Sequence, residues 1–127
     1  MAGSAWGGFY TTFIAGLDSR LKAASCMFGC GSLQLGNNWW DSQGPNLKRD
    51  DTFRKRWAQT LDPALRLSKS QTPIAWFTGT NDTFYWLPSV IDSHAKAAGP
   101  KHLTVLANYN HALTPIIDDQ VFAWLDV

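Results

Sequence analysis

The sequence has few features of a secreted, membrane-bound or disulfide-stabilised protein. No apolar run approaches the roughly 20 residues of a membrane-spanning helix, and the first residues lack the basic-then-apolar order of a signal peptide. The two cysteines, Cys26 and Cys30, are too few for a disulfide framework and lack the companion ligands of a zinc site. We therefore expect buried free thiols. As given, the chain is expected in the cytoplasm with no membrane partner.

A strong charge of one sign is also missing. With 11 basic and 10 acidic residues the formal net charge is +1, which gives no general attraction to nucleic acid. The basic run at 54–56 follows Asp50 and Asp51 at helical spacing, so we interpret it as a solvated helix face. No internal repeat or low-complexity segment interrupts the chain. Its 127 residues, 45% of them hydrophobic, predict one globular domain over 1–127.

The most informative stretch that is present lies at the start of the chain. The string GSAWGG at 3–8 has the spacing of the G-x-S-x-G nucleophile elbow, a sharp turn from a strand into a helix. Small residues two before and two after the nucleophile allow the backbone to double back. The residue at the serine position is Ala5, which has no hydroxyl. The sequence predicts that the turn is kept while its reacting atom is absent.

Helical and strand patterns alternate along the rest of the chain. Helical periodicity is found over 8–17, from Pro88 to Gly99 and from Pro115 onward, and strand patterns over 21–28, 72–77 and 103–106. Residues 32–70 read as a loop and helical insertion between the first two of these strands. This order predicts an α/β fold of three αβα layers, with a short parallel sheet of about three strands.

Two polar residues follow strands of this predicted sheet. Asp82 comes after the strand at 72–77, and His111 after the strand at 103–106. Loops beyond the carboxyl ends of parallel strands gather at one edge, where active residues are found. A carboxylate there can hold an imidazole in one tautomer, and the imidazole can move a nucleophile's proton. The alternatives are an ordinary turn residue for Asp82 and a loop histidine satisfied by backbone for His111.

Three motifs in this order resemble the α/β-hydrolases, and in detail the acetyl xylan esterase, dienelactone hydrolase and prolyl-oligopeptidase-related enzymes. They are GSAWGGFYTT at 3–12, FTGTND at 77–82 and NYNH at 108–111. The resemblance covers essentially the whole chain and implies the C-terminal half of such an enzyme. It implies hydrolysis of a carboxylic ester by a Ser-His-Asp triad, with no cofactor and no metal.

Carried over by position, the resemblance places the nucleophile at Ala5, the acid at Asp82 and the base at His111. The backbone N–H of Trp6 would be an oxyanion-hole donor. Loop aromatics could line an acyl or sugar pocket, although core packing or contact with a partner would use the same residues. These aromatics are Trp39, Trp40, Tyr85 and Trp86.

Other candidates for the same chemistry carry less support. Ser4 lies one residue before the position that an elbow points outward, and Cys30 follows a different strand. His94 falls in a predicted helix and His102 at a strand start, so both are expected to be structural or exposed. Ala5 therefore remains the preferred nucleophile position, and His111 the preferred base.

Two functions remain open at this point. One is an ester hydrolase that is inactive as given, because Ala5 replaces the nucleophile and the family's N-terminal half is absent. The other is a catalytically dead domain, natural or engineered, that acts by self-association or ligand binding. In the family, strands precede the elbow, whereas only Met1 and Ala2 precede Gly3 here. We therefore expect an unpaired edge at 21–28 and a homo-oligomer formed through it.

Overall fold

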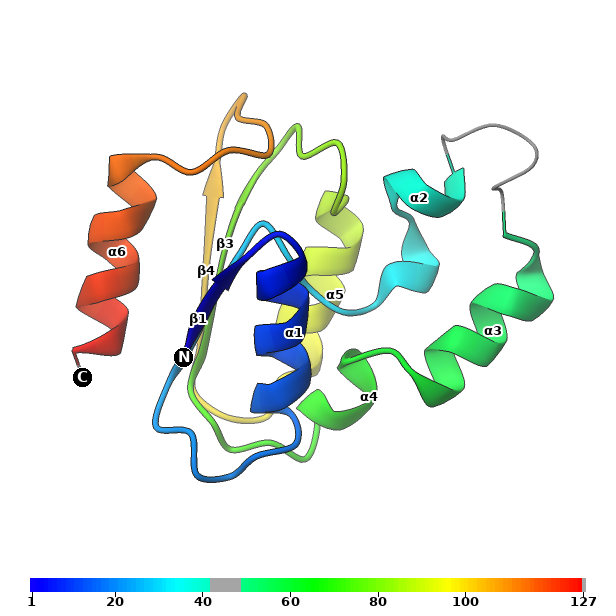
Figure 1. Cartoon of the computed structure of the whole chain (residues 1–127), viewed down its shortest axis with the longest axis horizontal. Helices are drawn as coiled ribbons and strands as arrows, with labels where there is room; N and C mark the ends of the chain where they lie inside the picture. Colours follow the sequence, from blue (N-terminus) through cyan, green and yellow to red (C-terminus); the bar gives the residue numbers. More distant parts are fainter. Residues whose placement is uncertain (42–48, 127) are drawn as a thin grey trace.

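A parallel β-sheet organises the fold of the computed structural model, which describes residues 1–41 and 49–126 (Figure 1). Its strands lie side by side in chain order: β1 (Ala2–Ser4), β2 (Ala24–Met27), β3 (Ile74–Gly79) and β4 (Lys101–Leu106). Every neighbouring pair is parallel, and one row across the sheet joins Gly3, Cys26, Trp76 and Leu103. All four strands therefore end at the same edge.

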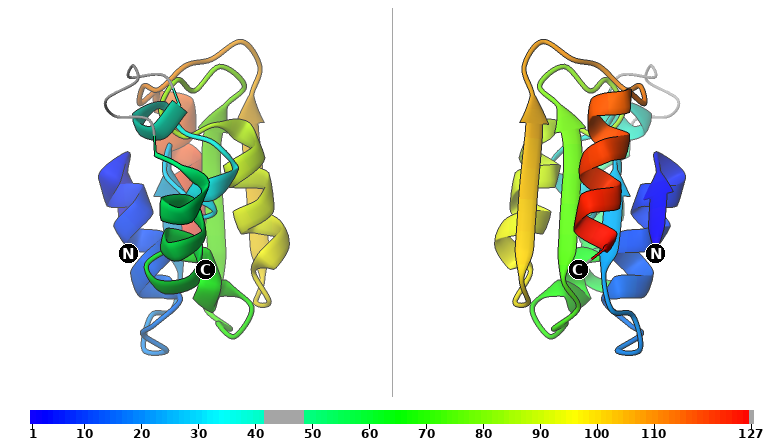
Figure 2. Two further views of the ribbon diagram at one scale, coloured as in Figure 1. Left: turned by 90° about the vertical axis from the view of Figure 1, so that its right-hand side faces the viewer. Right: turned by 90° about the vertical axis from the view of Figure 1, so that its left-hand side faces the viewer.

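Helices cover both faces of this sheet and give three αβα layers, as the sequence predicted (Figure 2). They are α1 (Trp6–Ala15), the 3₁₀ turn η1 (Leu33–Leu35), α2 (Asn38–Asp41), α3 (Asp51–Thr60), α4 (Ala64–Leu67), α5 (Leu87–Lys96) and α6 (Pro115–Leu125). Helices α1, α4 and α5 lie on one face and α6 on the other. Within the described ranges, none of them is both long and apolar enough to cross a membrane.

Strand β3 lies inside the sheet, and every one of its residues is buried. Its alternate side chains enter two cores, because successive residues of a strand point to opposite faces. Trp76 packs on the α1 and α5 side, whereas Ala75 and Phe77 pack against Ile117 of α6. The near-continuous apolar sequence of this strand thus reflects a parallel sheet that is covered on both faces.

Strand β1 corrects the predicted strand count and the predicted open edge. The sheet has four strands in the described part of the chain, where the sequence predicted about three with 21–28 unpaired. Ser25 N donates to Met1 O and Ala5 N donates to Met27 O, both at 2.9 Å. A three-residue Ala-Gly-Ser segment has no strand pattern of its own and is extended because β2 offers it hydrogen-bond partners. The open edge therefore belongs to β1.

The segment between β2 and β3 is pinned to the fold by one buried carboxylate. Asp62 accepts backbone N–H groups of Ser32, Leu33 and Ala64 at 2.7, 2.9 and 2.8 Å, and the indole N–H of Trp57 at 3.2 Å. These four donors satisfy a charge that would otherwise be costly to bury. One carboxylate thus joins the end of β2 to α3 and α4.

Two helices begin with a side-chain cap, and part of the segment predicted as loop is helical. Asp50 accepts Phe53 N at 2.8 Å and caps α3, and Thr114 accepts Ile116 N at 3.3 Å before Pro115 in α6. The predicted loop around Trp39 and Trp40 instead contains η1 and α2. Residues 42–48 of the predicted insertion lie outside the described residues.

Both cysteines are free thiols in the core. Neither Cys26 nor Cys30 has any solvent-exposed surface. Burial raises the pKa of Cys26 to about 12. Burial, with the nearby charges of Asp62 and Asp82, raises the pKa of Cys30 well above its ordinary value. The thiolate is disfavoured at both positions.

We therefore predict that the folded protein resists thiol reagents near pH 8. Reaction requires an accessible thiolate, and the raised pKa values keep both groups protonated until the pH is far higher. Titration with a chromogenic disulfide should find no reactive thiol in the native protein and two after unfolding in guanidinium. Labelling of the native protein at the rate of a free thiol would contradict the buried positions.

Candidate active site

The loops that follow the four strands meet at the carboxyl edge of the sheet. Ala5 follows β1, Phe28 follows β2, Asp82 lies three residues after β3, and His111 lies in the loop after β4. In Figure 1 this is the end toward which the strand arrows point. The sequence placed Ala5, Asp82 and His111 at this edge. The structure adds Phe28 to them.

Ala5 occupies a strained turn between β1 and α1. Its backbone angles are φ 53° and ψ −119°, a region that residues with a side chain rarely adopt. The turn is held by close backbone approaches. A Cβ on Gly3 would lie 2.3 Å from the carbonyl oxygen of Gly7, and a Cβ on Gly29 would lie 2.3 Å from that of Ala5. Phe9 N donates to Ala5 O at 3.0 Å, so α1 begins directly at the turn.

Asp82 and His111 form a hydrogen-bonded pair. Nδ1 of His111 lies 3.1 and 3.0 Å from the two carboxylate oxygens of Asp82. The Asp82 side chain is 0% exposed, that of His111 18%. Asp82 Oδ1 also accepts the backbone N–H groups of Phe84 at 2.8 Å and Tyr85 at 3.0 Å. Since a carboxylate only accepts, Nδ1 donates, and Nε2 keeps its lone pair in the neutral ring.

Hydrogen bonds between two loops fix this pair in position. Asn110 Oδ1 accepts the backbone N–H of Thr83 at 3.1 Å and that of His111 at 2.7 Å. Asn81 N donates to Tyr109 O at 2.9 Å. The loop that carries Asp82 is therefore joined by backbone contacts to the loop that carries His111. The pairing does not depend on the two side chains alone.

Aromatic rings surround His111 and connect it to the turn at Ala5. Ring centroids lie 4.9 Å away for Phe84, 5.4 Å for Phe28 and 6.1 Å for Tyr85. Tyr85 stacks on the imidazole at an interplanar angle of 18° and meets the Trp6 ring edge-on at 6.2 Å. Tyr85 thus lies between His111 and the residue that follows Ala5.

The Tyr85 hydroxyl is buried and has no hydrogen-bond partner in the described residues. Burial raises the pKa of this phenol, and the charge of Asp82 raises it further. The group therefore stays a neutral phenol near neutral pH. Its ring, rather than its hydroxyl, makes the described contacts with the site.

The predicted pocket aromatics divide into two groups. The Trp39 ring lies 4.8 Å from Trp6 and 5.0 Å from Tyr85, so these three gather beside His111. Trp40 instead is buried in the insertion, where its ring contacts Trp57 at 5.3 Å. Sequence spacing could not separate Trp39 from Trp40, because adjacent residues of a short helix point to different neighbours.

Trp86 is held close to the start of α5. A Cβ on Gly36 would lie 2.6 Å from the Trp86 ring, so the indole covers this glycine. Its N–H donates to Thr83 O at 3.3 Å. The described contacts of Trp86 therefore join the insertion to the loop that carries Asp82.

The alternative nucleophiles lie in unsuitable surroundings. Ser4 is the last residue of β1 and precedes the strained turn, and Cys30 is buried with a raised pKa. Among the other histidines, His94 packs edge-on against Trp76 at 6.0 Å, and His102 bonds to Thr104 at 2.9 Å. In the described ranges, no group of three or more His, Cys, Asp or Glu side chains could hold a metal ion.

Sequence reasoning did not identify three residues that position His111. Phe28 and Phe84 flank its ring, and the side-chain Oδ1 of Asn110 accepts its backbone N–H. Phe28 could have been found, because it follows β2 as Ala5 follows β1. Phe84 and Asn110 carry no such signal, since their roles depend on loop conformations that a pattern of residue types does not specify.

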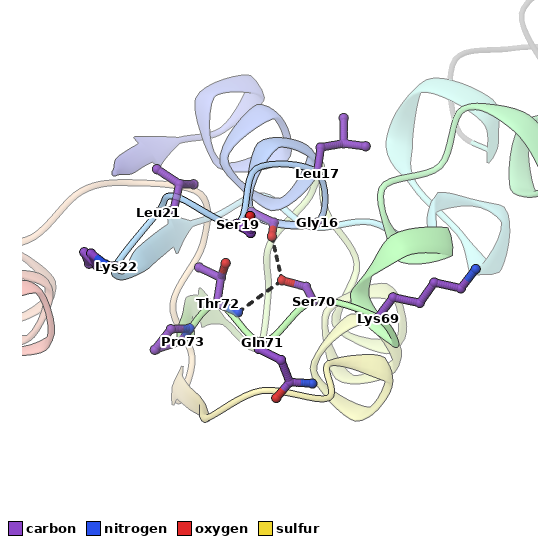
Figure 3. A pocket seen from close by; sticks show the side chains of 11 residues that line it. Gly16, Leu17, Ser19, Leu21, Lys22, Lys69, Ser70, Gln71, Thr72 and Pro73 are labelled. Atoms are coloured by element: carbon purple, nitrogen blue, oxygen red, sulfur yellow. Dashed lines mark hydrogen bonds between the residues drawn. The ribbon is translucent and has the colours of Figure 1, made fainter.

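A cavity of about 410 Å³ lies at the opposite end of the sheet (Figure 3). It is bounded by the end of α1 and the segments that lead into β2 and β3. Ser70 Oγ donates to Ala15 O at 2.6 Å and accepts Thr72 N at 3.2 Å, so this hydroxyl on its wall is satisfied. In Figure 3 the amines of Lys22 and Lys69 point away from it on opposite sides. This cavity is separate from the His111 site.

Comparison with solved structures identifies the fold. No family model and no curated protein matches the chain. It superposes on the acetyl xylan esterase from Paenibacillus sp. R4 with TM-score 0.82 and 19% identity, covering 98% of this chain and 44% of that one. It superposes on acetyl xylan esterase 1 from Thermoanaerobacterium sp. JW/SL YS485 with TM-score 0.76 and 13% identity, covering 98% of this chain and 43% of that one.

A Mycobacterium tuberculosis puromycin-hydrolyzing peptidase matches with TM-score 0.68 and 19% identity over 88% of this chain and 18% of that one. The chain thus spans less than half the length of each of these three structures. At such low identity the likeness is one of fold. The chain therefore has part of the α/β-hydrolase fold.

Proposed function

We propose that the carboxyl edge of this sheet is the site of an ester hydrolase that lacks its nucleophile. The observation that carries this proposal is the fully buried Asp82 carboxylate bonded to Nδ1 of His111. The pair lies at the same edge as Ala5, whose positive φ is kept although alanine gains no chemistry from it. A histidine held in one tautomer beside such a turn fits proton transfer to and from a side chain at position 5.

With a serine at position 5, the proposed reaction uses His111 as the base and a backbone N–H as the donor to the oxyanion. Nε2 of His111 takes the hydroxyl proton as the serine oxygen attacks the ester carbonyl carbon. The carbonyl electron pair moves onto oxygen, and the Trp6 N–H, at the start of α1, donates to this oxyanion. The electron pair then returns to the carbonyl carbon, and the alcohol leaves with the proton from His111, which gives an acyl-enzyme. Water attacks this acyl group in the same way, with His111 taking its proton, and the acid leaves as the serine is restored.

Small acyl esters are the substrates that we propose. Two structural neighbours are named acetyl xylan esterases. The rings of Trp6, Trp39 and Tyr85 gather at the site and offer apolar surface to an acyl or sugar group. Neither cofactor nor metal enters the proposed steps.

A second function is favoured by Ala5 itself. The methyl side chain cannot attack a carbonyl, so the protein with Ala5 would bind an ester without turnover. In that case the site would act in ligand binding, and the Asp82–His111 pair would serve as a polar contact. The two functions differ in what a hydroxyl at position 5 does.

We predict that Ala5→Ser creates hydrolysis of p-nitrophenyl acetate. Removal of the nucleophile from a triad lowers the rate on the order of 10⁴-fold or more, so its return to a prepared turn should raise the rate by a similar factor. Initial rates of p-nitrophenolate release measure this directly. His111→Ala in the same background should abolish the gain, whereas His102→Ala should leave it unchanged.

A folded Ala5→Ser protein with no gain in rate would contradict the hydrolase proposal. The second function would then be the better account. The native near-UV circular dichroism of its tryptophans would show that the variant is folded. The comparison is informative because Ala5 already occupies the strained turn, so the serine adds only a hydroxyl to it.

We also predict that Asp82→Asn, in the Ala5→Ser background, lowers the rate by roughly 10³- to 10⁴-fold. An amide can present N–H to His111 and so favour the wrong tautomer. Asp119→Asn, a change of the same kind on the exposed side of α6, should have no effect. Equal rates for the two variants would rule out a role for Asp82 in orienting His111.

A further inference from the structure

The hydrogen bonds between Asp82 and His111 leave the plane of the imidazole undetermined. They fix one ring atom, Nδ1, which lies 3.1 and 3.0 Å from the two carboxylate oxygens. Rotation about the bond from Cβ to a histidine ring has broad, roughly twofold minima, so contacts at one atom allow the ring to tilt. Proton transfer at Nε2 needs a fixed ring, because small displacements of a reacting group slow a reaction strongly. Packing must therefore supply the remaining constraint.

Tyr85 is the described neighbour that is placed to set this plane. Its ring is nearly parallel to the imidazole, with an interplanar angle of 18° and a centroid separation of 6.1 Å. The rings of Phe28 and Phe84 instead meet the imidazole at 60° and 65° and close its flanks. A flat ring that is packed nearly parallel to the imidazole opposes its tilting, since protein interiors leave little free space for side chains to move.

The Tyr85 ring is itself firmly held by the insertion. It has no solvent-exposed surface, and Trp39 meets it edge-on with ring centroids 5.0 Å apart. An antiparallel bridge joins the backbone of Tyr85 to that of Asn37. The Asn37 side chain donates to Leu33 O at 2.9 Å and accepts Trp40 N at 3.1 Å. The insertion therefore braces the ring that lies against His111.

Tyr85 also contacts the other member of the pair. Its backbone N–H donates to Oδ1 of Asp82 at 3.0 Å, while its ring stacks on His111. The main chain of one residue thus holds the carboxylate, and its side chain lies along the imidazole. A movement of Tyr85 would change the geometry of both groups together.

The hydroxyl of Tyr85 makes no described contact in this arrangement. It is buried and has no hydrogen-bond partner among the described residues. A buried polar group without a partner is destabilising, so phenylalanine should be tolerated here at least as well as tyrosine. The role of the ring can therefore be separated from that of the hydroxyl by experiment.

We propose that Tyr85 is a positioning residue for His111. Braced by the insertion, its ring holds the imidazole in the orientation in which Nδ1 meets Asp82 and Nε2 keeps its lone pair for proton transfer. This orientation concerns His111 with or without a nucleophile at position 5. Only the effect of Tyr85 on a reaction rate rests on the proposed function.

Proton NMR of the protein with Ala5 tests the orientation without turnover. The Nδ1 proton of His111 should give a resolved downfield resonance that is absent from His111→Ala. Tyr85→Leu should broaden this resonance beyond detection, because an imidazole that tilts exchanges the proton with water. Tyr85→Phe should retain it. Tyr10→Leu, a change of the same kind at a 58% exposed residue, should retain it as well.

Tyr85→Met covers the case in which leucine prevents folding. Methionine is flexible and fills irregular gaps but has no flat face, so it should lose the resonance as leucine does. Near-UV circular dichroism of the tryptophans identifies the folded variants. Three results would overturn the proposal: no resonance in the unmutated protein, a resonance that persists in a folded Leu or Met variant, or its loss from Tyr85→Phe.

Kinetics in the Ala5→Ser background give the second readout. Tyr85→Leu should lower kcat for p-nitrophenyl acetate roughly 10- to 100-fold with little change in KM, and Tyr85→Phe should restore kcat. An inert Ala5→Ser protein would contradict the hydrolase proposal alone, since the resonance still decides the role of Tyr85. An active Ala5→Ser enzyme whose kcat is unchanged by Tyr85→Leu would contradict the positioning role and leave the hydrolase proposal intact.

Discussion

The close approach of two backbones at the end of β1 is the constraint on which the site depends. Gly3 meets the backbone of Gly7, and Gly29 meets the carbonyl of Ala5, at separations that leave no room for a side chain. These contacts hold residue 5 at a positive φ whatever its side chain is. The turn is therefore set by its neighbours. This explains how alanine can occupy a strained conformation that its own methyl group does not require.

The rest of the carboxyl edge shows the same reliance on backbone contacts. Ala5, Phe28 and Asn108 all have positive φ, and each follows a strand. The loops after β3 and β4 are joined through Asn110, whose side-chain Oδ1 accepts a backbone N–H from each loop. Strain and hydrogen bonding concentrate where the polar groups of Asp82 and His111 meet. The helical insertion is anchored separately, through Asp62.

The sequence predicted the α/β fold and the polar residues of the site, because both depend on local patterns. Glycine spacing revealed the turn at Ala5, and strand endings revealed Asp82 and His111. Strand β1 was missed since three small residues carry no periodicity, and its pairing depends on β2. The separation of Trp39 from Trp40 was missed for a similar reason. Which of two adjacent indoles faces the site is decided by tertiary packing, which residue types alone do not encode.

Trp6 has one side in the site and one side in solvent. Its ring meets Tyr85 edge-on, and Tyr85 stacks on His111. The Trp6 residue is nevertheless 47% exposed. A change in the surroundings of this indole is therefore only one ring away from the imidazole, so its fluorescence is a built-in reporter of the site.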